Sequence, residues 1–218
     1  MRKLLVSLLL LIYAQNAVSQ QFEIGPDFGC NFVNVANSEI TQGRAVIGKS
    51  LFSASEGLSV LYFFGDPRKY ITNGIRLSFS NSNRGVQSEN YSDSKFDFNS
   101  KSINLLYRRA GALGNKFGVY MEAGFGYNVF DNNTIYKGTV DELVAFNKLT
   151  ERLTIRSNEI AFLYGLGFDR TLFKDKFVCF FQFSGDAGIS KINVNSGAFR
   201  TQSLGAMIGL RYILKTGK

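Results

Sequence analysis

The stretch that decides the fold is SLGAMIGLRYIL, residues 203–214, near the end of the chain. Apolar residues occupy every second position from Leu204 to Leu214, and mainly small or polar residues stand between them. Alternation with a period of two is the pattern of a β-strand that has one apolar and one polar face. This stretch therefore predicts a strand whose two faces meet different environments.

The same alternation recurs along the chain. In GVYMEAGFGYNV, residues 118–129, one face carries Val, Met, Ala, Phe, Tyr and Val, and the other carries Gly, Tyr, Glu and Asn. Each such segment is long enough to cross a bilayer at a tilt, which takes about 9–11 residues. Eight strands are predicted in this way, at residues 21–34, 51–64, 69–81, 97–110, 117–130, 156–172, 177–188 and 200–214.

The connections between these strands alternate in length. Short turns on one rim and long loops on the other are the pattern of outer-membrane barrels, in which the short turns are periplasmic. An even number of strands also returns both chain ends to the periplasmic rim. The short connections are expected at 65–68, 111–116 and 173–176, and the longer polar ones near 35–50, 82–96, 131–155 and 189–199.

The apolar faces are too bulky for the inside of a small barrel. The chain has 21 Phe, 10 Tyr and 22 Gly, and the interior of an eight-stranded barrel is only wide enough for side chains to fill. Glycine-rich faces fit that interior, so the large apolar faces should point outward into lipid. A mean hydropathy of −0.02 is too low for helical spans but suits strands that alternate. We therefore expect an all-β fold: an eight-stranded antiparallel up-and-down transmembrane β-barrel.

The beginning of the chain has the pattern of an export signal. Arg2 and Lys3 precede an apolar run at residues 4–13, and Ala-Val-Ser then supplies small residues at a cleavage site. A membrane-anchor helix is the alternative, but the run is too short to span a bilayer. We expect a signal peptide over residues 1–19 and an outer-membrane β-barrel domain over residues 20–218, located in a bacterial outer membrane.

Charged residues fall on the small-residue faces, so they should lie in the lumen. Buried charges need partners, and the planar fork of arginine serves several acceptors. We expect a structural network of ion pairs; a proton path or an active site is the sharper alternative. The predicted network comprises Glu23, Asp27, Arg76, Arg108, Glu122, Glu159, Asp169, Asp186 and Arg211.

The chain lacks the residues of several common chemistries. It contains no histidine, which excludes Ser-His-Asp and Cys-His catalysis and most zinc sites. No phosphate-binding G-x-x-x-x-G-K-[ST] loop occurs. We therefore expect no enzymatic activity, no catalytic or cofactor-binding residues, no cofactor and no metal site.

The net charge and the cysteines are less informative. The formal net charge of +8 falls by two to +6 without Arg2 and Lys3. The basic residues are scattered, which favours attraction to anionic lipid headgroups over binding of nucleic acid. Cys30 and Cys179 occupy apolar faces of predicted strands and are interpreted as small buried apolar side chains; whether they pair stays open.

Five segments of the chain are distinctive: FEIGPDFGCNF, SINLLYRR, VYMEAGFGYNVF, LYGLGF and the final LGAMIGLRYIL. With them the chain resembles the PorT-like family of small outer-membrane β-barrels that is common in Bacteroidota, and the resemblance runs over essentially the whole mature chain. The last of them resembles a C-terminal barrel-assembly signal. The resemblance implies the barrel fold and the outer membrane, and one branch of the family is implicated in type IX secretion and gliding.

The functional hypothesis is a non-enzymatic outer-membrane barrel with a structural, adhesion or secretion- and assembly-accessory role. Its expected partners are outer-membrane lipid and other envelope or secretion-system proteins, contacted through the loops 82–96 and 131–155, because loops on a rigid scaffold carry variable function. Three alternatives remain at this point: a lipid-modifying barrel enzyme, a narrow ion channel, and a soluble periplasmic ligand-binding barrel.

Overall fold

Within the described residues, the chain forms nine β-strands. The computed structural model describes residues 20–37, 49–65, 71–87, 95–114, 116–131, 135–137, 158–190 and 199–216. The predicted signal peptide at 1–19 lies outside them. The strands are β1 (Gln20–Asn37), β2 (Lys49–Phe63), β3 (Ile71–Gln87), β4 (Lys95–Leu113), β5 (Phe117–Phe130), β6 (Ile135–Lys137), β7 (Asn158–Leu172), β8 (Phe177–Gly188) and β9 (Phe199–Thr216).

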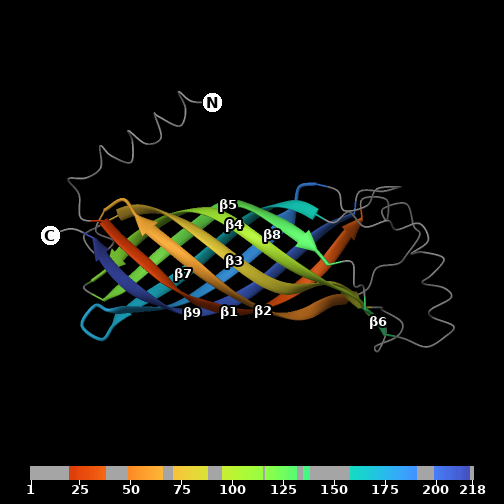
Figure 1. Cartoon of the computed structure of the whole chain (residues 1–218), viewed down its shortest axis with the longest axis horizontal. Helices are drawn as coiled ribbons and strands as arrows, with labels where there is room; N and C mark the ends of the chain where they lie inside the picture. The colour runs from red at the N-terminus through yellow and green to blue at the C-terminus, as the bar shows by residue number, and fades with distance from the viewer. Residues whose placement is uncertain are drawn as a thin grey trace, which may run out of the picture.

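Eight long strands close into a cylinder. Their order is β3-β2-β1-β9-β8-β7-β5-β4, and pairing of β3 with β4 completes the circle. All of these pairs are antiparallel. The predicted eight-stranded up-and-down barrel is therefore confirmed. The short β6, which pairs only with the start of β4, was not predicted and lies beyond one end of the cylinder (Figure 1).

The strands are steeply inclined to the barrel axis. A row of paired residues that starts at Phe177 on β8 and passes once round the barrel returns to β8 at Ala187. The register thus advances by ten residues for eight strands. A shear of this size gives a tilt of about 35–45°, as the inclined ribbons in Figure 1 show.

The two ends of the barrel differ in their connections. The turns after β2, β4 and β7 lie at one end, here called the turn end, where β1 also begins and β9 ends. The opposite end is called the loop end. The predicted loop 82–96 is wrong in its bounds, because β3 continues to Gln87 and β4 begins at Lys95. Polar side chains on both faces of this extension hide the alternation that marks the rest of β3.

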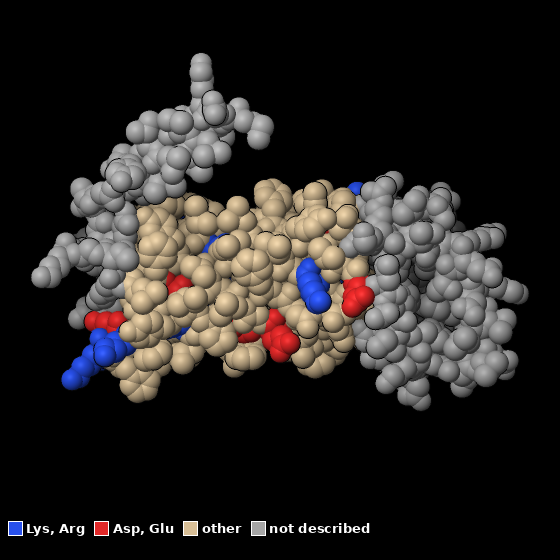
Figure 2. Space-filling model, in the orientation of Figure 1, with Lys and Arg blue, Asp and Glu red and all other residues tan. Residues whose placement is uncertain are grey.

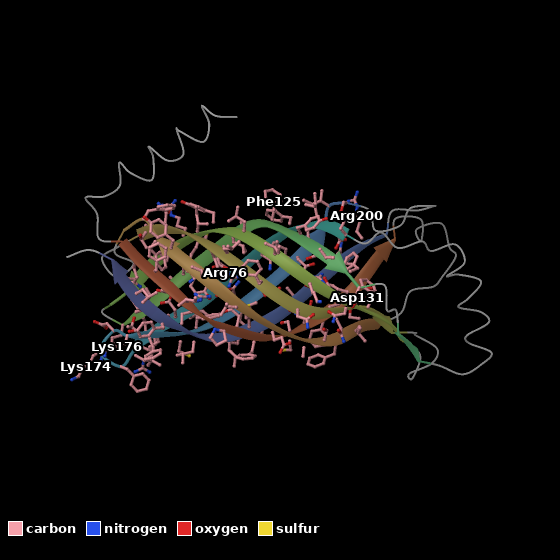
Figure 3. All side chains as sticks on the ribbon, viewed as in Figure 1. Arg76, Phe125, Asp131, Lys174, Lys176 and Arg200 are labelled. Atoms are coloured by element: carbon pink, nitrogen blue, oxygen red, sulfur yellow. The ribbon has the colours of Figure 1, made fainter. Side chains whose placement is uncertain are left out.

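The outer surface of the barrel is apolar, as expected. On β5, Met121 and Phe125 are 57% and 59% exposed, whereas Glu122 between them is 3% exposed. Phe125 points away from the barrel in Figure 3, and most of the wall in Figure 2 carries no charged residue. A continuous apolar surface of this kind is stable only in lipid. The alternative of a soluble barrel is inconsistent with this arrangement.

Basic and aromatic side chains gather on the outside near the turn end. Phe177 packs edge-on to Tyr212 at 5.3 Å between ring centroids, and the Arg170 guanidinium lies 4.9 Å from the centroid of Phe117. Lys174 and Lys176 are exposed beside them (Figure 3). Aromatic and basic residues at this level match a membrane interface. None of the described segments forms an apolar helix of membrane-spanning length.

Both cysteines are free and face outward. Cys30 is partly exposed and Cys179 is exposed, so the interpretation of both as buried side chains is wrong. Both cysteines lie on the strand faces that carry the lipid-facing residues. Lipid, and not a protein core, therefore surrounds them. In a bilayer they still act as small apolar groups.

Candidate functional site: the charged lumen

The lumen carries the charges that the alternation predicted to point inward. Arg108, Arg211 and Glu159 have no exposed surface, and Arg76 is 3% exposed. Figure 3 shows Arg76 inside the outline of the barrel. Because successive side chains of a strand point to opposite faces, period-two alternation fixes which side chains point into the interior.

Glu122 is the centre of the first group of charges. Its Oε1 accepts a hydrogen bond from Arg108 Nε at 2.5 Å, and its Oε2 lies 3.1 Å from Arg76 Nη2. Gln182 Nε2 donates to the same Oε2 at 3.1 Å. One carboxylate on β5 therefore ties together β3, β4 and β8 across the bore.

Arg211 joins a second set of carboxylates to this group. Its guanidinium lies 3.8 Å from both Glu23 and Asp27, and its Nε donates to Ser59 Oγ at 3.2 Å. Ser59 in turn donates to Asp27 at 3.0 Å. Asp27 is 3.9 Å from Arg76, which links the two sets into one central cluster.

Aromatic rings complete the central cluster. The Arg108 guanidinium lies 3.6 Å from the centroid of the Tyr120 ring, and that of Arg211 lies 3.9 Å from the Phe180 ring. Both contacts are buried, where cation–π attraction is strongest. Tyr120 also donates to Gln182 Oε1 at 3.2 Å.

Glycines make room for these rings. A Cβ atom at Gly167 would collide with the Tyr120 ring, and one at Gly209 would collide with the Phe180 ring. Both glycines lie within strands, where the lack of a side chain permits close packing. Glycine at these two positions therefore serves the packing of rings in the lumen.

A second group, the loop-end cluster, lies nearer the loop end. Arg84 Nη1 donates to Asp186 at 2.7 Å and to Thr201 Oγ1 at 3.3 Å. Glu159 accepts from the backbone N–H of Thr201 at 2.9 Å, from the Thr201 hydroxyl, and from Asn128 at 3.2 Å. In this cluster, hydroxyl and amide groups thus donate many of the hydrogen bonds to carboxylates that arginines donate in the central cluster.

Serines line a cavity of about 70 Å³ between the two clusters. It is large enough for a few water molecules, since each needs roughly 10–15 Å³. Arg76 and Asp27 face it from the central cluster, and Arg84 and Asp186 from the loop-end cluster. The serines are Ser55, Ser78, Ser80, Ser82, Ser102, Ser184 and Ser203.

Apolar side chains also fill the bore, contrary to the prediction of a glycine-rich interior. Toward the turn end, a core cluster is formed by Leu61, Phe63, Ala110, Tyr120 and Phe180. Further large residues buried in the lumen are Val33, Leu51, Phe98, Leu106 and Phe130. An eight-stranded barrel can hold these large side chains because glycines lie opposite the large rings. Glycine-rich faces therefore do not imply an interior of small residues only.

The predicted network is gathered only in part. Glu23, Asp27, Arg76, Arg108, Glu122 and Arg211 lie together in the central cluster, and Glu159 and Asp186 lie in the loop-end cluster. Asp169 forms none of the ion pairs among the described residues. Together with Glu23 it lines a cavity of about 30 Å³ at the turn end, beside Gly118.

Several residues of the site were missed from the sequence. Arg84 falls within the predicted loop 82–96, although its spacing of eight from Arg76 gives it the same inward parity on β3. Gln182 and Ser59 carry no charge, so nothing marked them as members of a charge network. Within the described residues, no group of His, Cys, Asp and Glu could hold a metal ion.

The closed eight-stranded barrel, with an apolar exterior and a polar, side-chain-filled lumen, defines the class of bacterial outer-membrane β-barrels. The predicted location in a bacterial outer membrane is confirmed. No protein-family model and no curated protein sequence matches the chain.

Solved structures agree with this class. The chain is similar to the outer membrane protein OprG of Pseudomonas aeruginosa, with a TM-score of 0.55 and 16% identity over 93% of this chain and 99% of that one. It is also similar to neisserial surface protein A, with a TM-score of 0.51 and 14% identity over 88% of this chain and 96% of that one. At such low identity, the similarity shows the fold alone.

Proposed function

We propose that this protein is a non-enzymatic barrel of the outer membrane that serves as a rigid anchor and contacts other envelope proteins through its outer loops. An adhesion role or a secretion- and assembly-accessory role fits this proposal. The second is what the resemblance to the PorT-like family implies. On this proposal, residues 1–19 are the signal peptide that directs export.

The observation that carries the proposal is the filled bore. Ion pairs and aromatic rings cross the barrel in the central cluster, and the two cavities of about 70 and 30 Å³ lie on opposite sides of it. A pore that conducts solutes needs a continuous aqueous path, which larger barrels provide and eight-stranded ones fill. Function is therefore expected at the rims and on the outer wall.

The loop between β5 and β7 provides the sharpest test. Val129 and Asn158 are paired partners on these strands, so a short Gly-Ser turn can replace residues 132–156 without moving the barrel. The variant should keep the heat-dependent gel mobility of the folded barrel. It should lose the partners that co-purify with the full-length chain from native membranes.

A second variant shortens the connection between β3 and β4, residues 88–94, which belongs to the other loop expected to contact partners. Unchanged partners in the 132–156 variant would overturn its role as the contact loop, and unchanged partners in both variants would overturn the proposal. Unitary currents of the full-length protein in planar bilayers would favour the ion channel. A change in lipid A mass after deletion of the gene would favour the enzyme.

A further inference from the structure

The turn between β7 and β8, residues 173–176, carries basic side chains at the edge of the lipid-facing wall. The run of large outward-facing residues on β7 ends at Phe168, and Arg170 follows at the next outward position. Lys174 and Lys176 stand in the turn, and all three basic side chains are exposed. Figure 3 shows both lysines at the turn end of the barrel. We call Arg170, Lys174 and Lys176 the basic patch.

The basic patch has no charge partners among the residues that the structure describes. Within them, none of its three side chains takes part in an ion pair or donates a hydrogen bond. Arg170 contacts only the ring of Phe117, so its N–H donors remain available for a ligand. Asp175 supplies one negative charge within the turn, and Asp169 faces the cavity at the turn end instead of the outer surface. The outer surface of this hairpin therefore carries an excess of positive charge.

The turn holds its side chains in a backbone conformation that glycine adopts more easily. Phe173, Lys174 and Asp175 have φ angles of 50°, 54° and 66°. This left-handed region is unfavourable for residues that carry a side chain. Phe173 is nevertheless 72% exposed, more than any other large apolar side chain in the described part of the chain. Side chains that are kept at a strained turn without packing into the barrel point to a role in binding.

Aromatic rings continue from the turn onto the barrel wall. Phe173 packs edge-on to Phe177 with 5.9 Å between ring centroids, and Phe177 packs edge-on to Tyr212 at 5.3 Å. Aromatic side chains gather where the hydrocarbon core of a bilayer meets the headgroups. The basic patch therefore lies at the level of the lipid headgroups, beside rings that border the acyl chains.

We propose that the basic patch binds the phosphate groups of anionic phospholipids in the membrane leaflet at the turn end, which is the periplasmic rim in outer-membrane barrels. Lysine and arginine near a membrane surface attract anionic headgroups. A guanidinium such as that of Arg170 also donates parallel hydrogen bonds to phosphate oxygens. Anionic lipid thus gathers on one side of the barrel, independently of any partner of the outer loops.

The position of the basic patch favours a lipid over a soluble acidic partner. Arg170 belongs to the barrel wall and is paired with the outward-facing Cys179 on β8. A soluble protein has to displace the bilayer to reach it, whereas a headgroup phosphate already lies at this level. The outward residues near the turn end of β1, β2 and β9 are uncharged, so the other side of the rim lacks this attraction. They include Phe22, Tyr62 and Leu214.

The chain contains no tryptophan, which permits a test at a single site. Phe177→Trp places one fluorophore beside the basic patch in the full-length protein, reconstituted in mixtures of phosphatidylglycerol and phosphatidylcholine. Quenching by bromine on the acyl chains of either lipid gives the relative occupancy of the two lipids beside the fluorophore. Phosphatidylglycerol should be preferred at least about threefold. Val60→Trp, in the same register row three strands away, should show about equal occupancy.

Charge variants of the Phe177→Trp chain identify the groups responsible. The combined change Arg170→Gln, Lys174→Gln and Lys176→Gln should abolish the preference. The combined change Arg170→Lys, Lys174→Arg and Lys176→Arg keeps the charges and should retain it. Arg109→Gln is the matched control, because Arg109 lies on β4 about 16 Å from Arg170 between Cα atoms. It should leave the preference unchanged.

The heat-dependent gel mobility of each variant shows that its barrel is folded. Equal occupancy of the two lipids beside Phe177→Trp would overturn the proposal and would leave the basic patch to a soluble acidic partner. A preference that survives neutralisation of all three residues would overturn it as well. The same holds for a preference that falls equally with Arg109→Gln, or that is equally strong at Val60→Trp, since either result would reflect the net charge of the whole protein.

Discussion

The central and loop-end clusters solve the same problem, the burial of charge inside a membrane barrel, in different ways. In the central cluster, Glu122 is shared by Arg76 and Arg108, so removal of Glu122 deprives two buried arginines of a partner. In the loop-end cluster, Glu159 is held by a backbone N–H, a hydroxyl and an amide. The difference indicates that the central cluster fixes the barrel and that the loop-end cluster tolerates change.

The largest effect is expected when Glu122 is removed. Glu122→Ala leaves two buried arginines without their shared carboxylate, and an uncompensated buried charge typically costs about 3–5 kcal/mol. The free energy of unfolding in urea, measured in lipid vesicles, should fall by about this amount. Glu122→Gln, which preserves shape and some hydrogen bonds, should lose less. A fall below ~1 kcal/mol for Glu122→Ala would remove the distinction between the clusters.

A smaller loss in the free energy of unfolding is expected for a change in the loop-end cluster. Arg84→Ala removes the ion pair with Asp186, but Asp186 keeps the hydrogen bond from Ser203 and faces the serine-lined cavity. Loss of one hydrogen-bonded charge partner beside such a polar cavity should cost about 1–3 kcal/mol. The same urea titration checks this value. A loss as large as that of Glu122→Ala would show that both clusters are equally rigid.

The smallest effect is expected at the cavity wall. Ser102 donates one hydrogen bond to Asn128 Oδ1 at 2.7 Å. Ser102→Ala should therefore destabilise the barrel by about 1 kcal/mol, the net value of an ordinary hydrogen bond. Ser78→Ala is a matched control on the same cavity, since it loses only the longer contact from Asn104 at 3.3 Å. A larger loss at Ser78 than at Ser102 would contradict this ranking.

How far the sequence predicts this protein depends on the depth of each residue in the membrane. Where lipid lies on one side and the lumen on the other, as along β5, alternation marks both the strand and its inward charges. Beyond the bilayer, both faces of β3 meet polar surroundings and the pattern fades, which is why Arg84 falls within the predicted loop 82–96. The division of charges into two clusters follows from register, which no single strand reveals.

The inward aromatic residues were harder to predict. Phe180 stands on the inward face of β8 and fits only because Gly209 lies opposite it on the neighbouring strand. That pairing depends on the shear of the closed barrel, a property of all eight strands together. Glycine-rich faces alone indicate space, and the sequence does not show which ring occupies it.

The most direct test of the central claim measures which face of a strand meets lipid. Spin labels are placed one at a time at positions 101–105 of β4 in a reconstituted barrel with Ser at positions 30 and 179, and their accessibility to oxygen is measured. Labels at Lys101, Ile103 and Leu105 should be accessible, and labels at Ser102 and Asn104, which face the serine-lined cavity, should be protected. Accessibility without a period of two, or with the opposite phase, would contradict the outward orientation of the apolar face.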